Sequence, residues 1–183
     1  MMLNTEQILE RKVLRLENSK GAPSQIGYDL SVKEIKSIDG VGKIRSEKTE
    51  LPKYKTVKRA EIFPVDELNQ WDGDDSPPIT PGWYLDPGFY EVTFWEGCDI
   101  PNNLVGLMRQ RSSMMRSGTL LHSSVFDPGF STDNMGSFIA VFRPIFIEVN
   151  ARVAQMYFHE CEPVSSDKLY KGQFQNDKQR KGN

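Results

Sequence analysis

The feature that most constrains the fold is a series of short apolar segments in the second half of the chain. Gly, Pro, Asn and Asp separate these segments at intervals of about 8–12 residues, which is typical of β-sandwiches and barrels. The expected strands are WYLD, YEVTFWE, LVGLMRQ, TLLHSSVF, SFIAVFRP, IFIEV and RVAQMYFHE. The 14 Gly and 11 Pro of the chain also favour a turn-rich β fold.

The first half of the chain adds a helix and less regular segments. Thr5 is expected to cap a helix over EQILERKVLRLE, whose apolar residues fall close to a helical period. YDLSV alternates like a strand, whereas residues 36–60 are charged and predict a hairpin or loop. Residues 69–82 have the composition of a loop.

Length and charge limit the number of domains and the classes of partner. A chain of 183 residues suits one domain, which we expect over residues 1–165, followed by a polar and basic flexible tail over 166–183. A net charge of −2 gives no attraction to nucleic acid, and no apolar run approaches the length of a membrane helix. The N-terminus lacks the apolar region of a signal peptide. Cys98 and Cys161 lie far apart and are expected to be free thiols in a reducing cytoplasm.

The tetrapeptide DPGF occurs twice, beginning at Asp86 and at Asp127. Each copy predicts a tight turn after an extended segment, with Pro and Gly forming the turn. The local sequence does not decide whether these are two equivalent turns or whether one aspartate is catalytic.

Two other segments carry polar side chains suited to phosphate. In MRQRSSMMRSG, residues 108–118, two serines lie between two arginines, and guanidinium and hydroxyl groups together suit a triphosphate. The same pattern is also common on a short exposed helix. In NARVAQMYF, residues 150–158, Gln155 is a polar residue in an apolar strand, and alone it indicates a strand position more than a ligand.

In order and spacing, these segments resemble the motifs of the superfamily of trimeric dUTP diphosphatases and dCTP deaminases. IGYDLSV resembles the first motif, QRSSMMR the second, VFDPGF the third and RVAQM the fourth. LNTEQI near the start, the QRSSMMR segment and YKGQFQ in the tail are closer to the deaminase branch. The resemblance covers about residues 3–163 and is most specific over 104–158.

The resemblance implies an all-β fold, a distorted jelly-roll-like barrel with an N-terminal helix and one short internal helix near residues 112–117. It implies a homotrimer whose sites span subunit boundaries, and Mg²⁺ held mainly by phosphate oxygens and water. Asp127 would be the catalytic base, Asp86 would only form a turn, and Asp29 would act on the metal through water. Triphosphate donors would be Arg111, Ser112, Ser113, Arg116 and Gln155.

The remaining roles implied by the resemblance concern the nucleoside and the tail. The backbone of Ser123, Ser124 and Phe126 would read the pyrimidine edge. Phe130 would pack on the deoxyribose and exclude a 2′-hydroxyl. Lys171 and Gln173 would close over the phosphates, unless the tail remains disordered.

One departure from the deaminase branch concerns its glutamate, which activates water for attack on cytosine. The position ten residues after Asp127 is Ser137, and a four-residue insertion would move the equivalent position to Val141. Neither side chain can act as a base; Asp133 could substitute only from an inward-folded loop, and Glu148 belongs to another expected strand. The sequence therefore predicts hydrolysis of a deoxypyrimidine triphosphate, dUTP to dUMP and pyrophosphate. The alternatives are a dCTP deaminase, alone or bifunctional, and a non-catalytic nucleotide-binding protein on the same fold.

Overall fold

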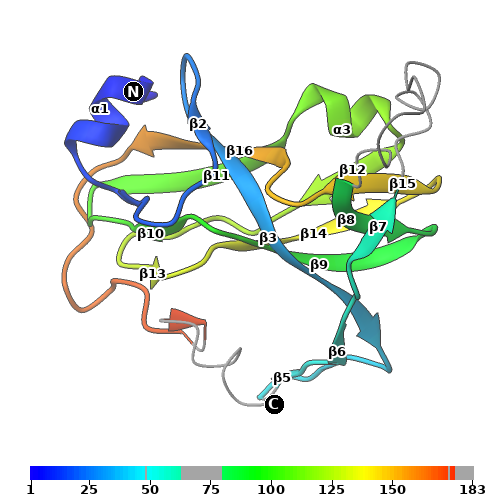
Figure 1. Ribbon diagram of the computed structural model, residues 1–183. Coiled ribbons are helices and arrows are strands. Elements are labelled where there is room, and N and C mark those ends of the chain that lie inside the picture. The colour runs from blue at the N-terminus through cyan, green and yellow to red at the C-terminus, as the bar shows by residue number, and fades with distance from the viewer. Residues whose placement is uncertain (48, 63–79, 173, 176–183) are drawn as a thin grey trace.

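The computed structural model describes residues 1–47, 49–62, 80–172 and 174–175, and β-strands form most of it (Figure 1). The helices are α1 (Thr5–Glu10) and α3 (Ser112–Arg116). The strands are β1 (Leu14–Arg15), β2 (Ala22–Pro23), β3 (Tyr28–Asp39), β4 (Lys43–Ile44), β5 (Thr49–Glu50), β6 (Lys53–Thr56), β7 (Ala60–Ile62), β8 (Thr80–Leu85), β9 (Gly88–Phe94), β10 (Gly97–Asp99), β11 (Leu104–Gln110), β12 (Thr119–His122), β13 (Ser131–Thr132), β14 (Gly136–Val141), β15 (Ile145–Glu148) and β16 (Arg152–Glu160).

An eight-stranded antiparallel sheet organises the molecule and curls into a nearly closed barrel. Its main path runs β11-β16-β3-β9-β14-β12, with β2 and β6 also paired to β3. Gln110 joins the two ends of this path, because its side chain donates to the Thr119 carbonyl at 3.2 Å and accepts from the Leu121 N–H. The predicted all-β barrel with an N-terminal helix and a short internal helix is confirmed.

The N-terminal helix is shorter than predicted, and its cap is a different residue. Asn4, not Thr5, is the cap: its side chain accepts from the Gln7 N–H at 2.9 Å, while the Gln7 side chain accepts from the Asn4 N–H. The helix ends at Glu10 because Lys12 has a φ of 52°, outside the helical region. The chain then turns inward, and Leu14 is buried where β1 pairs with β10.

Three other segments differ from their predicted boundaries. The region predicted as a hairpin or loop over 36–60 includes the end of β3, its partner β6 and the small β4–β5 hairpin. TLLHSSVF is a strand only to His122, because the chain then leaves β14 and crosses to β11. Of the loop predicted over 69–82, residues 80–82 belong to β8 and the others lie outside the described residues.

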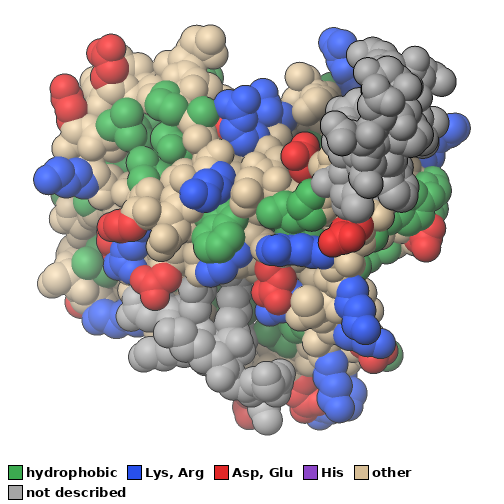
Figure 2. Space-filling view, in the orientation of Figure 1, with side chains coloured by type: hydrophobic (Ala, Val, Ile, Leu, Met, Phe, Trp, Pro, Cys, Tyr) green, Lys and Arg blue, Asp and Glu red, His purple; other side chains and the backbone are tan. Residues whose placement is uncertain are grey.

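The core fills the barrel with large apolar side chains from nearly every long strand. Trp83, Phe94 and Phe158 are the largest fully buried ones. Neither Cys98 nor Cys161 forms a disulfide in the described part of the chain. Among the helices that the structure describes, none has the length and apolar character needed to cross a membrane. On the face seen in Figure 2, basic and acidic side chains are interspersed.

A buried carboxylate fastens the N-terminal segment to the barrel. Glu96 has no exposed surface, and its oxygens accept from both the N–H (2.9 Å) and the hydroxyl (2.7 Å) of Ser31 on β3. They also accept from the Ser19 hydroxyl at 2.6 Å and the Gly21 N–H at 3.0 Å, in the segment between β1 and β2. Both oxygens of the Glu96 carboxylate therefore act as hydrogen-bond acceptors, and together they receive four donors.

Changing Glu96→Gln tests this connection. An amide presents an NH₂ group where one oxygen accepts now, so at least one buried donor loses its acceptor and the protein should lose about 2–3 kcal/mol of stability. Denaturant unfolding of the variant gives the measurement, with the exposed Glu162→Gln as the control. Equal stability of both variants would show that Glu96 does not fasten this segment.

Candidate active site

The predicted site residues form two groups at opposite ends of β11. The first group surrounds Asp29 on β3, close to the point where β11 leads into α3 (Figure 1). The second group lies on the DPGF turn at Asp127, reached through a bridge between Phe126 and Gly106 near the start of β11.

Asp29 is the centre of the first group. Its carboxylate is buried and forms ion pairs with Arg111 at 3.2 Å and with Arg152 at 3.9 Å. The Arg111 guanidinium also donates to the Arg152 carbonyl at 3.2 Å. Both arginines are partly exposed, so the buried anion fixes their direction while leaving guanidinium N–H groups available to an anionic ligand.

Gln155 lies beside Asp29 because the two residues are cross-strand partners in the β16–β3 pair. Its amide donates to the Ser24 hydroxyl, and that hydroxyl donates to the Gly27 carbonyl at 3.0 Å. Gly27 makes this approach possible, since a Cβ there would lie 2.5 Å from the Met156 carbonyl oxygen. The first and fourth motifs are therefore brought together by strand register.

The two serines of the second motif lie in the first turn of α3, directly after Arg111. Ser112 and Ser113 are both exposed, and the buried Met114 packs this short helix onto the core. Arg116, in the last turn, is exposed. The arrangement presents hydroxyl and guanidinium groups next to the Asp29 cluster, as a phosphate site requires.

Arg109 is a candidate binding residue that the sequence interpretation missed. It pairs with Gln155, which in turn pairs with Asp29, so the three residues form a row on one face of three adjacent strands. Arg109 is exposed. The sequence did contain a sign of this role: Arg109 lies two residues before Arg111, so both side chains fall on one face of an extended segment.

The second group begins where the chain crosses from β12 to β11. Phe126 and Gly106 exchange two backbone hydrogen bonds of 2.9 Å each. A Cβ at Gly106 would lie 3.0 Å from the Phe126 Cβ and closer still to the end of the Met156 side chain. Within the described part of the chain, the backbone N–H groups of Ser124 and Val125 have no hydrogen-bond acceptor, so they are open to a ligand.

Asp127 starts a hydrogen-bonded turn, with the Phe130 N–H donating to its carbonyl at 3.0 Å. Gly129 has a φ of 88°, a conformation suited to glycine. The Asp127 carboxylate is exposed, and no described residue forms an ion pair or hydrogen bond with it. It is thus free to act on water or ligand.

Asp86, in the other DPGF copy, is the turn former that the sequence predicted. It lies between β8 and β9, and its carbonyl accepts from the Tyr90 hydroxyl at 2.9 Å. Burial of the Tyr90 hydroxyl and the nearby Asp86 carboxylate raise the pKa of Tyr90 above its ordinary value. The two identical tetrapeptides therefore have different surroundings.

The C-terminal segment contacts the turn at Asp127. The Tyr170 N–H donates to the Pro128 carbonyl at 2.9 Å, and the Gln175 amide donates to the Gly129 carbonyl at 2.9 Å. Lys171 is exposed, while Gln173 lies outside the described residues. The division of the chain into a domain ending at 165 and a flexible tail stays a prediction, as do the binding roles of these two residues.

The two groups are separated along β11. Phe126 forms a backbone bridge with Gly106 on β11. Gly106 lies five positions before Arg111, which directly follows β11. At the rise of an extended strand, this offset corresponds to about 17 Å. One chain therefore supplies two separate half-sites, one with Asp127 and one with Arg111 and Asp29.

None of the positions considered for a deaminase glutamate places a free carboxylate on β14 or in the loop after Asp127. Ser137 and Val141 are buried on β14, and Glu148 lies on β15 in a separate three-stranded sheet. Asp133 forms an ion pair with Arg15. The loop after Asp127 thus does not supply the second carboxylate that deamination needs.

Arg15 also binds Asp99, with two contacts of 2.7 Å. Burial alone would raise the pKa of Asp99. Hydrogen bonds from Arg15 and Ser131, together with the charge of Arg15, outweigh burial and hold this pKa below its ordinary value. Asp99 and Asp133 are therefore structural anions that neutralise Arg15.

The described residues contain no cluster of three or more metal-ligating side chains. Asp29, the predicted contact to a metal shell, already has two arginine partners. Mg²⁺ keeps several water ligands and binds readily to substrate phosphates. The residues therefore fit a metal carried by phosphate better than a metal held by the protein, and the contact of Asp29 with a metal shell stays a prediction.

Gly27→Ala tests the close packing of the first group. The added Cβ would lie 2.5 Å from a backbone carbonyl, so a strand must shift and about 1–3 kcal/mol of stability should be lost. Gly88→Ala is the matched control, because its nearest contact is the movable Tyr90 side chain at 3.2 Å. Thermal unfolding of both variants compares them, and equal melting temperatures would contradict the argument.

Comparison of the chain with known proteins identifies its family. A family model for dCTP deaminase-like proteins matches residues 15–161. The deoxyuridine 5′-triphosphate nucleotidohydrolase of Methanocaldococcus jannaschii is 36% identical over 152 residues, covering 81% of this chain and 86% of that protein. A probable deoxyuridine 5′-triphosphate nucleotidohydrolase of Methanosarcina mazei is 32% identical over 168 residues, covering 88% of this chain and 87% of that protein.

A solved structure agrees on the fold. The 2′-deoxycytidine 5′-triphosphate deaminase of Agrobacterium tumefaciens superimposes with a TM-score of 0.55 at 15% sequence identity, over 88% of this chain. This chain spans 48% of the length of that deaminase, so the similarity supports the fold alone. The family model and the two relatives together settle the classification: the chain belongs to the dCTP deaminase-like family.

Proposed function

We propose that this protein is an enzyme that hydrolyses dUTP to dUMP and pyrophosphate. The observation that carries the proposal is the free, exposed carboxylate of Asp127 in a chain whose relatives, 30–36% identical over most of their length, are named deoxyuridine triphosphate nucleotidohydrolases. A single base is sufficient for hydrolysis at phosphorus, whereas deamination also needs a carboxylate at the cytosine ring.

In the proposed reaction, Asp127 orients a water molecule and takes its proton. The water oxygen forms a bond to the α-phosphorus while the bond to the bridging oxygen of the β-phosphate breaks, which releases pyrophosphate. Arg111, Gln155 and the serines of α3 donate to phosphate oxygens, where negative charge must be stabilised. Open N–H groups after Ser123 read the pyrimidine edge, and Phe130 packs on the deoxyribose.

We propose that the complete site forms between copies of the chain in a homotrimer. The separation of Asp127 from Arg111 along β11 supports this, since one half-site from each of two chains would complete the constellation. Exposed apolar side chains on β9, on β12 and directly after β14 supply surface for such contacts. These are Phe89, Leu120 and Phe142, with exposures of 51%, 54% and 64%.

Mg²⁺ is the proposed cofactor, bound to the triphosphate and neutralising part of its charge. Arg111 and Arg152 would hold the charged end of the substrate, and Asp29 would act on the metal through water. Two free thiols, Cys98 and Cys161, support a cytoplasmic location.

Two alternatives lead to different products. dCTP deamination, alone or beside hydrolysis, would release ammonia, but the described residues place no free carboxylate on β14. A non-catalytic nucleotide-binding protein would bind the triphosphate without releasing either product.

Asp127→Asn should lower pyrophosphate release from dUTP by about a hundredfold or more, because an amide cannot accept the water proton. Asp86→Asn is the matched control, as it changes the same residue in the same tetrapeptide and should retain full activity. Pyrophosphate and ammonia are assayed in parallel with Mg²⁺ and dUTP, dCTP, dTTP or UTP. Ammonia from dCTP, or equal activity of both variants, would contradict the proposal.

Mixing two inactive variants tests whether the site is shared between chains. Asp127→Asn and Arg111→Ala each destroy one half-site, so each variant alone should be inactive. After refolding together in equal amounts, about one quarter of the sites should combine an intact Asp127 from one chain with an intact Arg111 from another. A mixture that stays inactive, although both variants assemble, would place the whole site within one chain.

A further inference from the structure

We propose that Tyr170 and Gln175 are positioning residues that hold the ring of Phe130 in place and thereby set the preference for deoxyribose over ribose. The inference rests on the proposed function, because it gives Phe130 a sugar to contact. It assigns the C-terminal segment a role beyond closing over phosphates: the segment supports the wall of the sugar pocket.

Gln175 holds the backbone on both sides of Phe130. Its amide nitrogen donates to the Gly129 carbonyl at 2.9 Å, and its amide oxygen accepts from the Ser131 N–H at 3.1 Å. The two bonds come from one planar group and are separated by only one residue of the turn. They therefore restrict rotation of the peptide units that carry the Phe130 ring.

Tyr170 holds the ring itself. Its N–H donates to the Pro128 carbonyl at 2.9 Å, which fixes the tyrosine against the turn. Its ring meets the Phe130 ring edge to face, with centroids 5.3 Å apart and planes at 77°. Phe126 contacts the same ring at 5.7 Å and 70°, so two aromatic neighbours hold Phe130.

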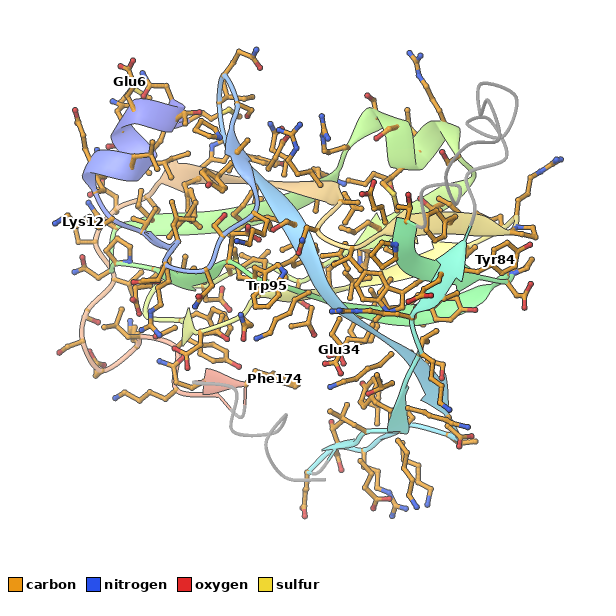
Figure 3. All side chains as sticks on the ribbon, in the orientation of Figure 1. Glu6, Lys12, Glu34, Tyr84, Trp95 and Phe174 are labelled. Carbon is orange, nitrogen blue, oxygen red and sulfur yellow. The ribbon has the colours of Figure 1, made fainter. Side chains whose placement is uncertain are left out.

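The backbone of the turn at Gly129 packs closely against the C-terminal segment. A Cβ at Gly129 would lie 2.8 Å from the Leu169 Cβ and 3.1 Å from the Tyr170 nitrogen. Absence of a side chain there lets the two backbones approach. Phe174, labelled in Figure 3, continues the segment, and its N–H donates to the Tyr170 hydroxyl at 3.4 Å.

Exclusion of a ribose 2′-hydroxyl depends on ring position. The proposed discrimination is steric, and a hydroxyl is excluded only if the ring cannot move aside by about the size of one atom. A displacement of about 1 Å at a reacting or binding group can change rates by up to a hundredfold. The contacts to Tyr170 and Gln175 oppose such a displacement.

The experiment compares kcat/KM for dUTP and UTP in Tyr170→Ala, Tyr170→Phe and Gln175→Ala. Tyr170→Ala and Gln175→Ala should each lower the dUTP-to-UTP preference by about tenfold. Tyr170→Phe keeps the ring and the backbone bond, so it should stay within about twofold of the wild type. Ser166→Ala, an exposed change in the same segment, is the control and should leave the preference unchanged.

The outcomes separate this inference from the proposed function. If the wild type releases no pyrophosphate from dUTP, the proposed function itself fails. If the wild type prefers dUTP and Tyr170→Ala keeps that preference, only the positioning role is overturned. A parallel fall in kcat/KM for both nucleotides, with an unchanged ratio, would also overturn it, since that result indicates general loss of structure or phosphate contacts. Melting temperatures of all variants identify any that are unfolded.

Discussion

The pairing of β16 with β3 is the constraint on which the first half-site depends. It sets Gln155 beside Asp29 and buries the Asp29 carboxylate between two arginines. A buried carboxylate requires compensating charge, so Arg111 is drawn to this position at the exit of β11. The serines of α3 follow Arg111 directly, and their place therefore depends on the same interaction.

The second half-site is positioned by a different strand contact, and this separation supports the proposal that the site is shared between chains. The bridge between Phe126 and Gly106 fixes the Asp127 turn near the start of β11, whereas Arg111 lies past its end. In the proposed homotrimer, a second copy of the chain supplies the other half-site.

Sequence reasoning predicted the all-β barrel because alternation and turn residues act locally. It separated Asp127 from Asp86 only through the order of motifs, since the two tetrapeptides are identical. It placed the helix cap at Thr5 rather than Asn4 because both residues are good caps, and the capping partner Gln7 decides between them. The contacts of Tyr170 could not be predicted in this way, because they depend on long-range packing. Arg109 was missed although it lies two residues before Arg111, because only strand register aligns it with Gln155 and Asp29.

The loss of the deaminase glutamate is best explained by how β14 distributes its side chains. Ser137, Ile139 and Val141 point into the core, so a carboxylate at any of these positions would be buried without a cation. The other face of the strand presents Phe138 and Ala140. With the inner face closed to charge and the outer face apolar, β14 supplies no carboxylate, and the proposed acid–base role is assigned to Asp127 on its exposed turn.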